Sequence, residues 1–234
     1  MNAFIVYAHP EPKSFNGALL ARGVETLRAS GHEVEVSDLY RMGFDPVSDR
    51  RNFSGVKDPD CFKQQEEEIH ASQTGGFAPG LAAEMEKLRR CDLLILQCPL
   101  WWFGLPAILK GWVDRVFAMG FAYGMGQWYS RGVFSGKRAL VCLTTGGPAP
   151  MYAPDGVNGD IEQILFPIQH GMLYFTGFGV LPPFIAWSVA RASDEARRVY
   201  LEAYAKRLRG AFEAAPIPFP PLEAYDEQFR LVRS

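Results

Sequence analysis

Short apolar runs alternate along this chain with segments that carry hydrophobic residues at helical spacing. The runs predict strands at 3–8, 33–38, 93–96, 138–143 and 180–188. The spacing predicts helices at 16–29, 84–90, 108–117 and 194–212. Pro182 and Pro183 make the last strand irregular, because proline cannot donate a ladder hydrogen bond. Strands that alternate with helices predict an α/β fold: a doubly wound, parallel five-stranded sheet with helices on both faces.

Two segments do not fit this alternation. Residues 43–80 are polar and lack periodicity, and a loop of that length in one domain is usually functional or forms an interface arm. The segment after Phe212 contains four prolines and cannot form a regular helix. We therefore expect one domain over 1–212 with a long loop at 43–80, followed by an irregular Pro-rich tail at 213–234.

Composition and charge narrow the class of protein. The 234 residues are 48% hydrophobic and 21% charged, so the chain can bury a sizeable core. A net charge of -2 gives no basic field for nucleic acid or a membrane surface. The apolar start at 3–8 lacks a basic flank, so neither a signal peptide nor a membrane span is predicted. The four cysteines form no C-x-x-C pair, and reduced, buried thiols in a cytoplasmic protein are expected.

The loop after the first strand, His9 to Asn16, carries neither a G-x-G-x-x-G motif nor a Gly-Lys-Ser/Thr motif. A dinucleotide site of the Rossmann type and a P-loop are therefore not predicted. The loop does offer a hydroxyl, an amide and backbone N–H groups where a helix begins, which suits phosphate oxygens. The alternative is that Ser14 only caps the helix and that His9 lies on the surface.

Two further loops follow strands in the same way. The strand at 93–96 runs into Pro99 and then into Trp101, Trp102 and Phe103, a wall for a flat ligand. The strand at 138–143 runs into Thr144-Thr145-Gly146-Gly147, where a backbone without side chains can approach a ring closely. Loops at the carboxyl ends of parallel strands share one crevice, which favours a nucleotide with a flat ring system.

Taken together, these motifs resemble the NAD(P)H quinone reductases of the DT-diaphorase type. The resemblance rests on Ser14-Phe15-Asn16, Pro99 to Gly104, Pro106 to Trp112, Thr144 to Gly147 with Met151-Tyr152, and Pro167-Ile168-Gln169. It implies a flavodoxin-like fold, a homodimer, bound FAD rather than FMN, and two-electron, ping-pong transfer from NAD(P)H to a quinone.

The resemblance also implies roles for single residues. It places the cofactor against His9, Ser14, Phe15, Asn16, Lys63, Pro99, Leu100, Trp101, Trp102, Phe103, Thr144, Thr145, Gly146, Gly147, Tyr152 and Arg197. It implies catalytic roles for Gly147, Tyr152 and the position of Asn158, and substrate contacts for Tyr123, Met125, Trp128 and Phe175. Some relatives bind zinc near the position of His170, but Tyr174 and the cysteine-free tail remove the other ligands, so no metal is expected.

The sequence departs from the family at Asn158, where the best-known members have a histidine. An asparagine cannot take up a proton near neutral pH, so we expect Tyr152 and water to stabilise the reduced flavin, with Asn158 orienting them. Met125 replaces a tyrosine, and acceptor preference should shift accordingly. Two other functions stay open: a flavin-binding ancillary subunit of a potassium efflux system, and an azo or nitro reductase.

Overall fold

A parallel sheet forms the centre of the computed structural model, which describes residues 1–232. Its strands are β1 (Asn2–Tyr7), β2 (Glu33–Asp38), β3 (Leu93–Pro99), β4 (Arg138–Thr144), β5 (Gly179–Val180) and β6 (Phe184–Ala186). The order is β2-β1-β3-β4-β5, and β6 also pairs with β4. The expected fifth strand is therefore two short strands, because Pro182 and Pro183 interrupt the pairing with β4.

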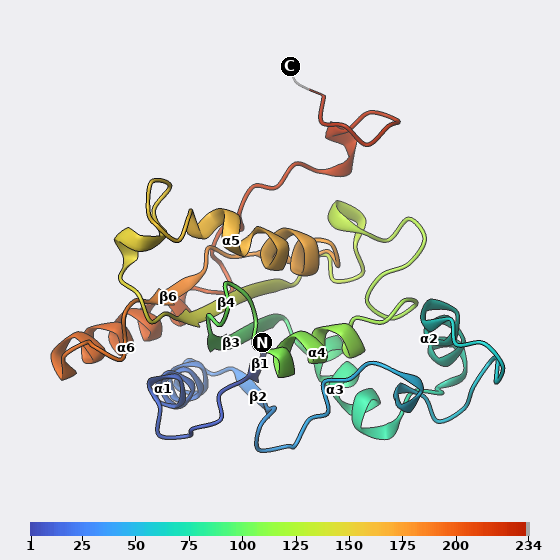
Figure 1. Ribbon diagram of the computed structural model, residues 1–234, viewed down its shortest axis with the longest axis horizontal. Helices are drawn as coiled ribbons and strands as arrows, with labels where there is room; N and C mark the ends of the chain where they lie inside the picture. The colour runs from blue at the N-terminus through green and yellow to red at the C-terminus, as the bar shows by residue number, and fades with distance from the viewer. Residues whose placement is uncertain (233–234) are drawn as a thin grey trace.

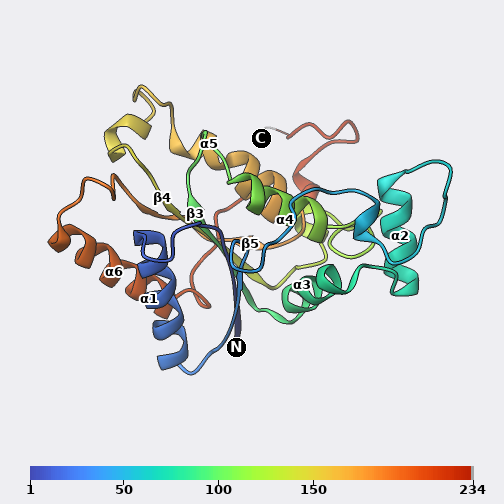
Figure 2. The same cartoon turned by 60° about the horizontal axis from the view of Figure 1, so that its bottom comes forward.

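Helices cover both faces of the sheet, as expected (Figure 2). One face packs against α1 (Phe15–Ala29) and α6 (Asp194–Arg209), and the other against α3 (Pro79–Arg90), α4 (Ala107–Val116) and α5 (Ile161–Ile168). Side chains of β1 alternate between the two cores: Ile5 and Tyr7 join the α1/α6 side, while Phe4 and Val6 join the other. This alternation is the direct result of the period-two geometry of a strand.

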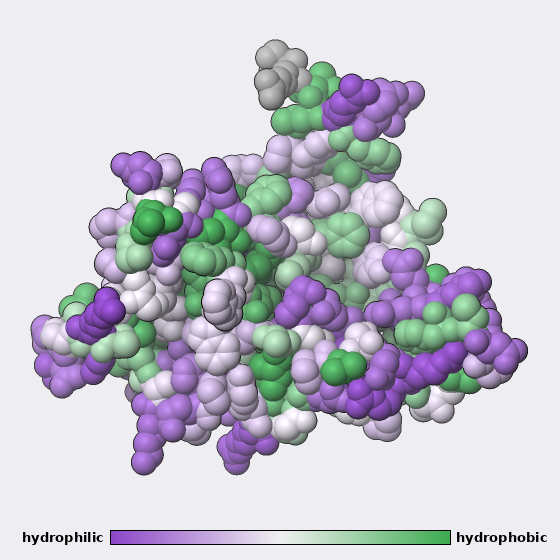
Figure 3. Space-filling view, viewed as in Figure 1, coloured by the Kyte–Doolittle hydropathy of each residue, from purple (hydrophilic) through white to green (hydrophobic). Residues whose placement is uncertain are grey.

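The segment 43–80 contains more regular structure than its sequence indicates. It forms α2 (Gln64–Thr74), and α3 already begins at Pro79 rather than at Glu84. Two buried carboxylates hold α2 in place: Glu67 accepts the N–H groups of Lys57 and Asp58, and Glu68 accepts that of Met119 at 2.7 Å. Because α2 is polar over most of its surface, visible as purple in Figure 3, it carries little hydrophobic periodicity.

The helix α5 was also absent from the sequence prediction. Pro167 lies inside it, and proline usually ends a helix. Here Pro167 falls at the last turn, and the chain continues into a wider π-type turn at Gln169–Tyr174. The wider turn accommodates the missing N–H donor, so the helical direction persists past the proline.

The tail leaves the body above α5 and is irregular apart from a 3₁₀ turn at Leu222–Ala224 (Figure 1). Side-chain contacts fix it: Tyr174 donates to the carbonyl of Pro220 at 3.0 Å, and Arg131 pairs with Glu223 at 2.7 Å. Near its start, the Ile217 N–H donates to the Val180 carbonyl at 2.7 Å. No helix among residues 1–232 is long and apolar enough to cross a membrane.

The cysteines are free thiols, and three of the four are buried. Burial raises the pKa of Cys91 and of Cys142 to about 12, so these thiols stay protonated and unreactive at neutral pH. Cys61 is exposed, which contradicts the expectation that all four are buried; it lies in the polar segment before α2, where no core is available.

Candidate functional site

A cleft of about 510 Å³ opens at the carboxyl ends of the central strands, where the sequence placed the ligand. Its walls come from the loop after β1, the ends of β3 and β4, and the start of α6. The lining residues are His9, Lys13, Ser14, Phe15, Asn16, Ala18, Pro99, Thr144, Val189, Ala190 and Arg197. Seven of these were expected to hold the cofactor.

The loop after β1 is folded against the first turn of α1. Ser14 caps the helix, its hydroxyl accepting the Gly17 N–H at 3.2 Å, and it lines the cleft as well. The capping role and the ligand role are thus compatible. A Cβ at Gly17 would lie 2.0 Å from the Pro12 carbonyl oxygen, so only glycine lets the loop close in this way. The result is a helix N-terminus that faces the cleft, a favourable place for an anion.

Asn16 is the most informative residue of the cleft. It is 3% exposed, and its Nδ2 donates to the Thr144 hydroxyl at 2.7 Å, yet its Oδ1 is buried without a partner. Buried polar atoms are normally paired, so an orphan beside a cleft points to a ligand. Because the Thr144 hydroxyl can donate as well as accept, the amide can turn over and present its NH2 to phosphate oxygens. The donor set therefore fits a phosphate-bearing cofactor.

The aromatic loop after β3 forms a tight hairpin. The N–H groups of Trp101 and Gly104 each donate to the other residue's carbonyl, at 3.2 and 3.0 Å. Trp102 and Phe103 at its tip adopt left-handed backbone conformations, with φ of 50° and 58°. Such a conformation costs about 1–2 kcal/mol per non-glycine residue. The Trp102 side chain is 97% exposed, so within one chain the hairpin presents its rings outward.

The loop after β4 gathers the three residues expected to be catalytic. The Leu100 N–H donates to the Thr144 carbonyl at 2.8 Å, which ties this loop to the aromatic hairpin. Gly147 packs closely on Tyr152, whose ring lies 5.3 Å from that of Trp187. Asn158 is half-buried and follows in the same loop, its N–H donating to the Met151 carbonyl at 2.8 Å.

The two expected cations of the cofactor site lie in different places. Arg197 lines the cleft and is oriented by a 3.0 Å ion pair with Asp194 and by the Val189 carbonyl. Lys63 is not among the lining residues. It lies at the start of α2, at the far end of the molecule from α1 and α6, where it pairs with Glu66 at 3.2 Å (Figure 1).

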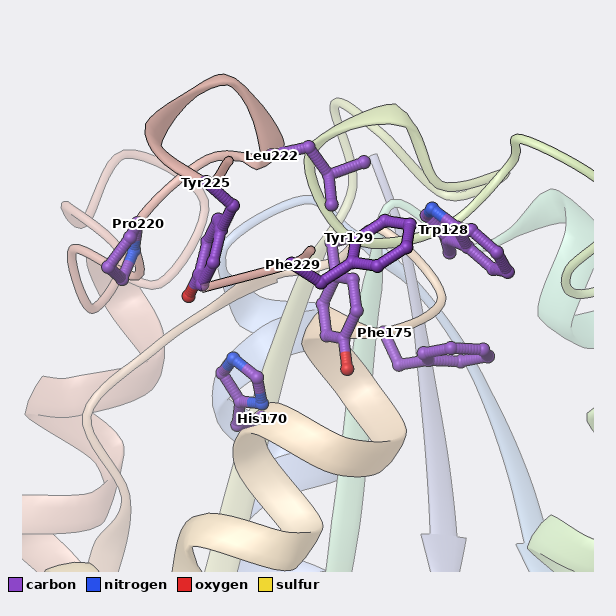
Figure 4. A pocket seen from close by; sticks show the side chains of 8 residues that line it. All are labelled: Trp128, Tyr129, His170, Phe175, Pro220, Leu222, Tyr225 and Phe229. Atoms are coloured by element: carbon purple, nitrogen blue, oxygen red, sulfur yellow. The ribbon is translucent and has the colours of Figure 1, made fainter. Parts of the chain in front are cut away.

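Two of the four expected substrate residues line a second, aromatic pocket of about 330 Å³ (Figure 4). Trp128 and Phe175 line it, and the Tyr123 ring lies 5.4 Å from that of Phe175. Met125 is 85% exposed nearby in the sequence. The tail supplies the other wall, through Pro220, Leu222, Tyr225 and Phe229. Sequence reasoning missed these tail residues; the only signal was the recurrence of aromatic residues in a Pro-rich segment.

His170 lies at the edge of this pocket among aromatic rings. It stacks on Phe166 with 4.6 Å between ring centroids and 10° between planes, and Phe219 meets it edge-on. Burial lowers the pKa of His170, which favours the neutral ring. Within residues 1–232 no three His, Cys, Asp or Glu side chains come together as metal ligands. His170 is thus a half-buried ring packed among aromatic side chains at the pocket wall.

Comparisons with known proteins agree with the observed fold. A family model described as flavodoxin-like fold matches residues 1–208. The chain is 45% identical over 218 residues to ribosyldihydronicotinamide dehydrogenase (quinone) of Mus musculus, which covers 93% of this chain and 94% of the relative. It is 44% identical over 229 residues to NAD(P)H dehydrogenase (quinone) 1 of Rattus norvegicus, covering 97% and 84%. The solved structure of a candidate quinone reductase from Klebsiella pneumoniae superposes with a TM-score of 0.95 at 40% identity, covering 99% and 93%.

Proposed function

Because this chain belongs to the flavodoxin-like family of NAD(P)H quinone reductases, we propose that it is an FAD-dependent NAD(P)H:quinone oxidoreductase. The observation that carries this proposal is the meeting of a phosphate cradle, an aromatic hairpin and a glycine-rich loop at one sheet edge. When bound, the flavin supplies hydride acceptance from NAD(P)H and two-electron delivery to a quinone, in ping-pong order.

The shape of the cleft supports FAD rather than FMN. Besides Ser14 and Asn16, the cleft lining includes Val189 and Ala190 before α6 and Arg197 in its first turn. An adenosine attached beyond the phosphates would have room there, whereas FMN ends at its phosphate. Arg197 can stack on a flat base, and its pairing with Asp194 keeps its plane fixed.

The residues of the chain itself bind, orient and stabilise charge. The N–H groups of Gly146 and Gly147 and the Tyr152 hydroxyl are the donors available at the ring end of the site, where negative charge develops on reduction. Within residues 1–232 the Tyr152 hydroxyl makes no side-chain hydrogen bond, so it is free to donate. Asn158 cannot take up a proton, and we expect it to orient a water molecule beside Tyr152.

A homodimer would complete the site. The cleft and the aromatic pocket share no residue, and the rings of Trp102 and Phe103 face away from the body. Trp102 and Met125, both highly exposed, are of a kind that dimer interfaces enclose. A two-fold partner can place its own Tyr123, Met125 and Phe175 opposite the hairpin of the first subunit, so that a quinone lies between them.

One preparation tests the proposal. The protein should purify yellow, release FAD on denaturation, elute as a dimer in size-exclusion chromatography with light scattering, and oxidise NADH or NADPH when a quinone is added. A panel of quinones, azo dyes and nitro compounds identifies the acceptor class. A colourless protein that does not take up FAD or FMN would overturn the proposal. Bound flavin with negligible turnover would favour the ancillary, non-catalytic function.

A further inference from the structure

Gln97 is a polar residue in the middle of the otherwise apolar strand β3. Its side chain is 0% exposed, and its neighbours in the strand are leucine, isoleucine and cysteine. A buried amide destabilises the fold unless its polar groups are hydrogen-bonded. The role of Gln97 therefore has to be sought in its partners.

Those partners lie on the elements that build the cleft. The Gln97 Nε2 donates to the backbone carbonyl of Asn16 at 2.7 Å, and the Tyr204 hydroxyl donates to Gln97 Oε1 at 3.4 Å. Asn16 in turn donates to the Thr144 hydroxyl at 2.7 Å. A buried polar chain thus runs from α6 through β3 to the first turn of α1 and the end of β4.

One end of this hydrogen-bond network lies at the cleft. Asn16 and Thr144 both line the cleft, and Asn16 carries the orphaned Oδ1. Tyr204, at the other end, is fully buried on α6 and packs on Phe184 with 4.9 Å between ring centroids. A hydrogen-bond network that only satisfied core groups would lie within the core at both ends, whereas this one reaches the cleft lining at Asn16 and Thr144.

We propose that Gln97 and Tyr204 are positioning residues for the cofactor: they fix the first turn of α1, so that Asn16 and the helix N-terminus meet the phosphates of the flavin nucleotide. Neither residue reaches the ligand. The inference rests on the proposed flavin function and adds two residues to it, remote from the cleft lining. Gln97 sets where Asn16 lies, and Tyr204 keeps Gln97 in the rotamer that does so.

The test measures FAD binding to apoprotein, prepared by removing flavin from the purified protein, through quenching of flavin fluorescence. Gln97→Met keeps the volume and removes both hydrogen bonds, and we expect it to raise the FAD dissociation constant roughly tenfold. Tyr204→Phe removes one oxygen atom, and we expect roughly a threefold rise. Because Tyr204 acts through Gln97, the double variant should bind FAD no more weakly than Gln97→Met alone.

A matched control separates positioning from general loosening of the core. Glu84→Gln alters a buried pair on the opposite face of the sheet, where Glu84 accepts from Trp112 at 2.9 Å and from Lys87 at 2.6 Å. It should lower the melting temperature and leave FAD affinity unchanged. If Gln97→Met does not fold, Tyr204→Phe carries the same comparison.

The outcomes distinguish this inference from the function on which it rests. Wild-type apoprotein that takes up no flavin overturns both. A second outcome overturns the positioning role alone. In it the wild type binds FAD, and Gln97→Met and Tyr204→Phe bind FAD no more weakly than Glu84→Gln does at a similar loss of melting temperature. Additive effects of the two changes would show that Tyr204 does not act through Gln97.

Discussion

Gly146 and Gly147 are adjacent in the sequence, yet an added methyl group meets very different surroundings at each. A Cβ at Gly147 would lie 3.0 Å from Met151 Sδ and 3.2 Å from Tyr152 Cε2. A Cβ at Gly146 would have no heavy atom within 4 Å. If the flavin ring packs on this loop, the open space at Gly146 is the space that the ring occupies. Substitutions at these two glycines can therefore separate the stability of the loop from its role in flavin binding.

The expected magnitudes follow from these contacts. Gly146→Ala should leave the free energy of unfolding of the apoprotein unchanged or raise it by about 0.4–1 kcal/mol, since alanine restricts the unfolded chain. Its methyl group would overpack the ring, at about 1–3 kcal/mol, so the FAD dissociation constant should rise roughly 5- to 150-fold. Gly147→Ala should instead cost about 1–3 kcal/mol of apoprotein stability, or roughly 2–12 °C in melting temperature, because Met151 and Tyr152 must shift.

Thermal melts of the apoprotein and flavin titrations measure the two quantities separately. Gly80→Ala is a suitable control, because Gly80 lies in α3 and its Cβ would also have no neighbour within 4 Å. It should raise stability without changing flavin affinity. If Gly146→Ala binds FAD as tightly as Gly80→Ala does, the ring does not approach the glycine-rich loop and the placement of the flavin is refuted.

Three further predictions concern titration and donor choice. Burial raises the pKa of Glu68 above its ordinary value of 4.5. The protonated carboxyl therefore stabilises the fold below that pH, and this contribution is lost as the pH rises through the folded-state pKa. Urea unfolding should therefore show Glu68→Gln gaining on wild type between pH 4 and 8; a constant difference would contradict this. Asn158→His adds a group that titrates near pH 6.5, and stopped-flow flavin reduction should gain a pH dependence there, whereas an unchanged profile would rule out a proton relay at this position. Arg191 lines a groove with Trp187 and makes no ion pair within residues 1–232, and we expect it to contact the 2′-phosphate that distinguishes NADPH from NADH. Arg191→Ala should then lower kcat/KM for NADPH roughly tenfold more than for NADH, and equal losses would argue against this contact.

The core of the fold could be predicted from the sequence because it depends on local patterns. The apolar run at 93–96 forms the buried strand β3 as predicted, and α6 begins at Asp194 as predicted, with Ser193 as its N-cap. The expected end of α6 at Phe212 was three residues late, since Gly210 already leaves the helical conformation. The polar helix α2 was missed because it carries little hydrophobic periodicity, and α5 was missed because a proline inside a segment usually ends a helix.

The candidate site also has parts that the sequence predicts and parts that it does not. The three loops at the strand ends could be predicted, because parallel strands bring their carboxyl ends to one edge. The tail contacts of Tyr225 and Phe229 could not, since an irregular segment has no period that fixes its path. The buried partners of Gln97 were equally hidden: a glutamine in an apolar strand shows that a hydrogen bond is needed, not where its partner lies.

Both outer edges of the sheet carry features that oppose further strand pairing, by different means. At β2, the charged side chains of Glu33 and Glu35 discourage a neighbour, and Glu35 pairs with Arg90 at 2.9 Å. At β5, the tail occupies the edge through the Ile217 N–H and the Val180 carbonyl. An unprotected edge strand is a template for aggregation. A chain shortened at Phe212 should therefore keep its sheet but self-associate as the protein concentration rises. The tail would then prevent aggregation in addition to lining the aromatic pocket.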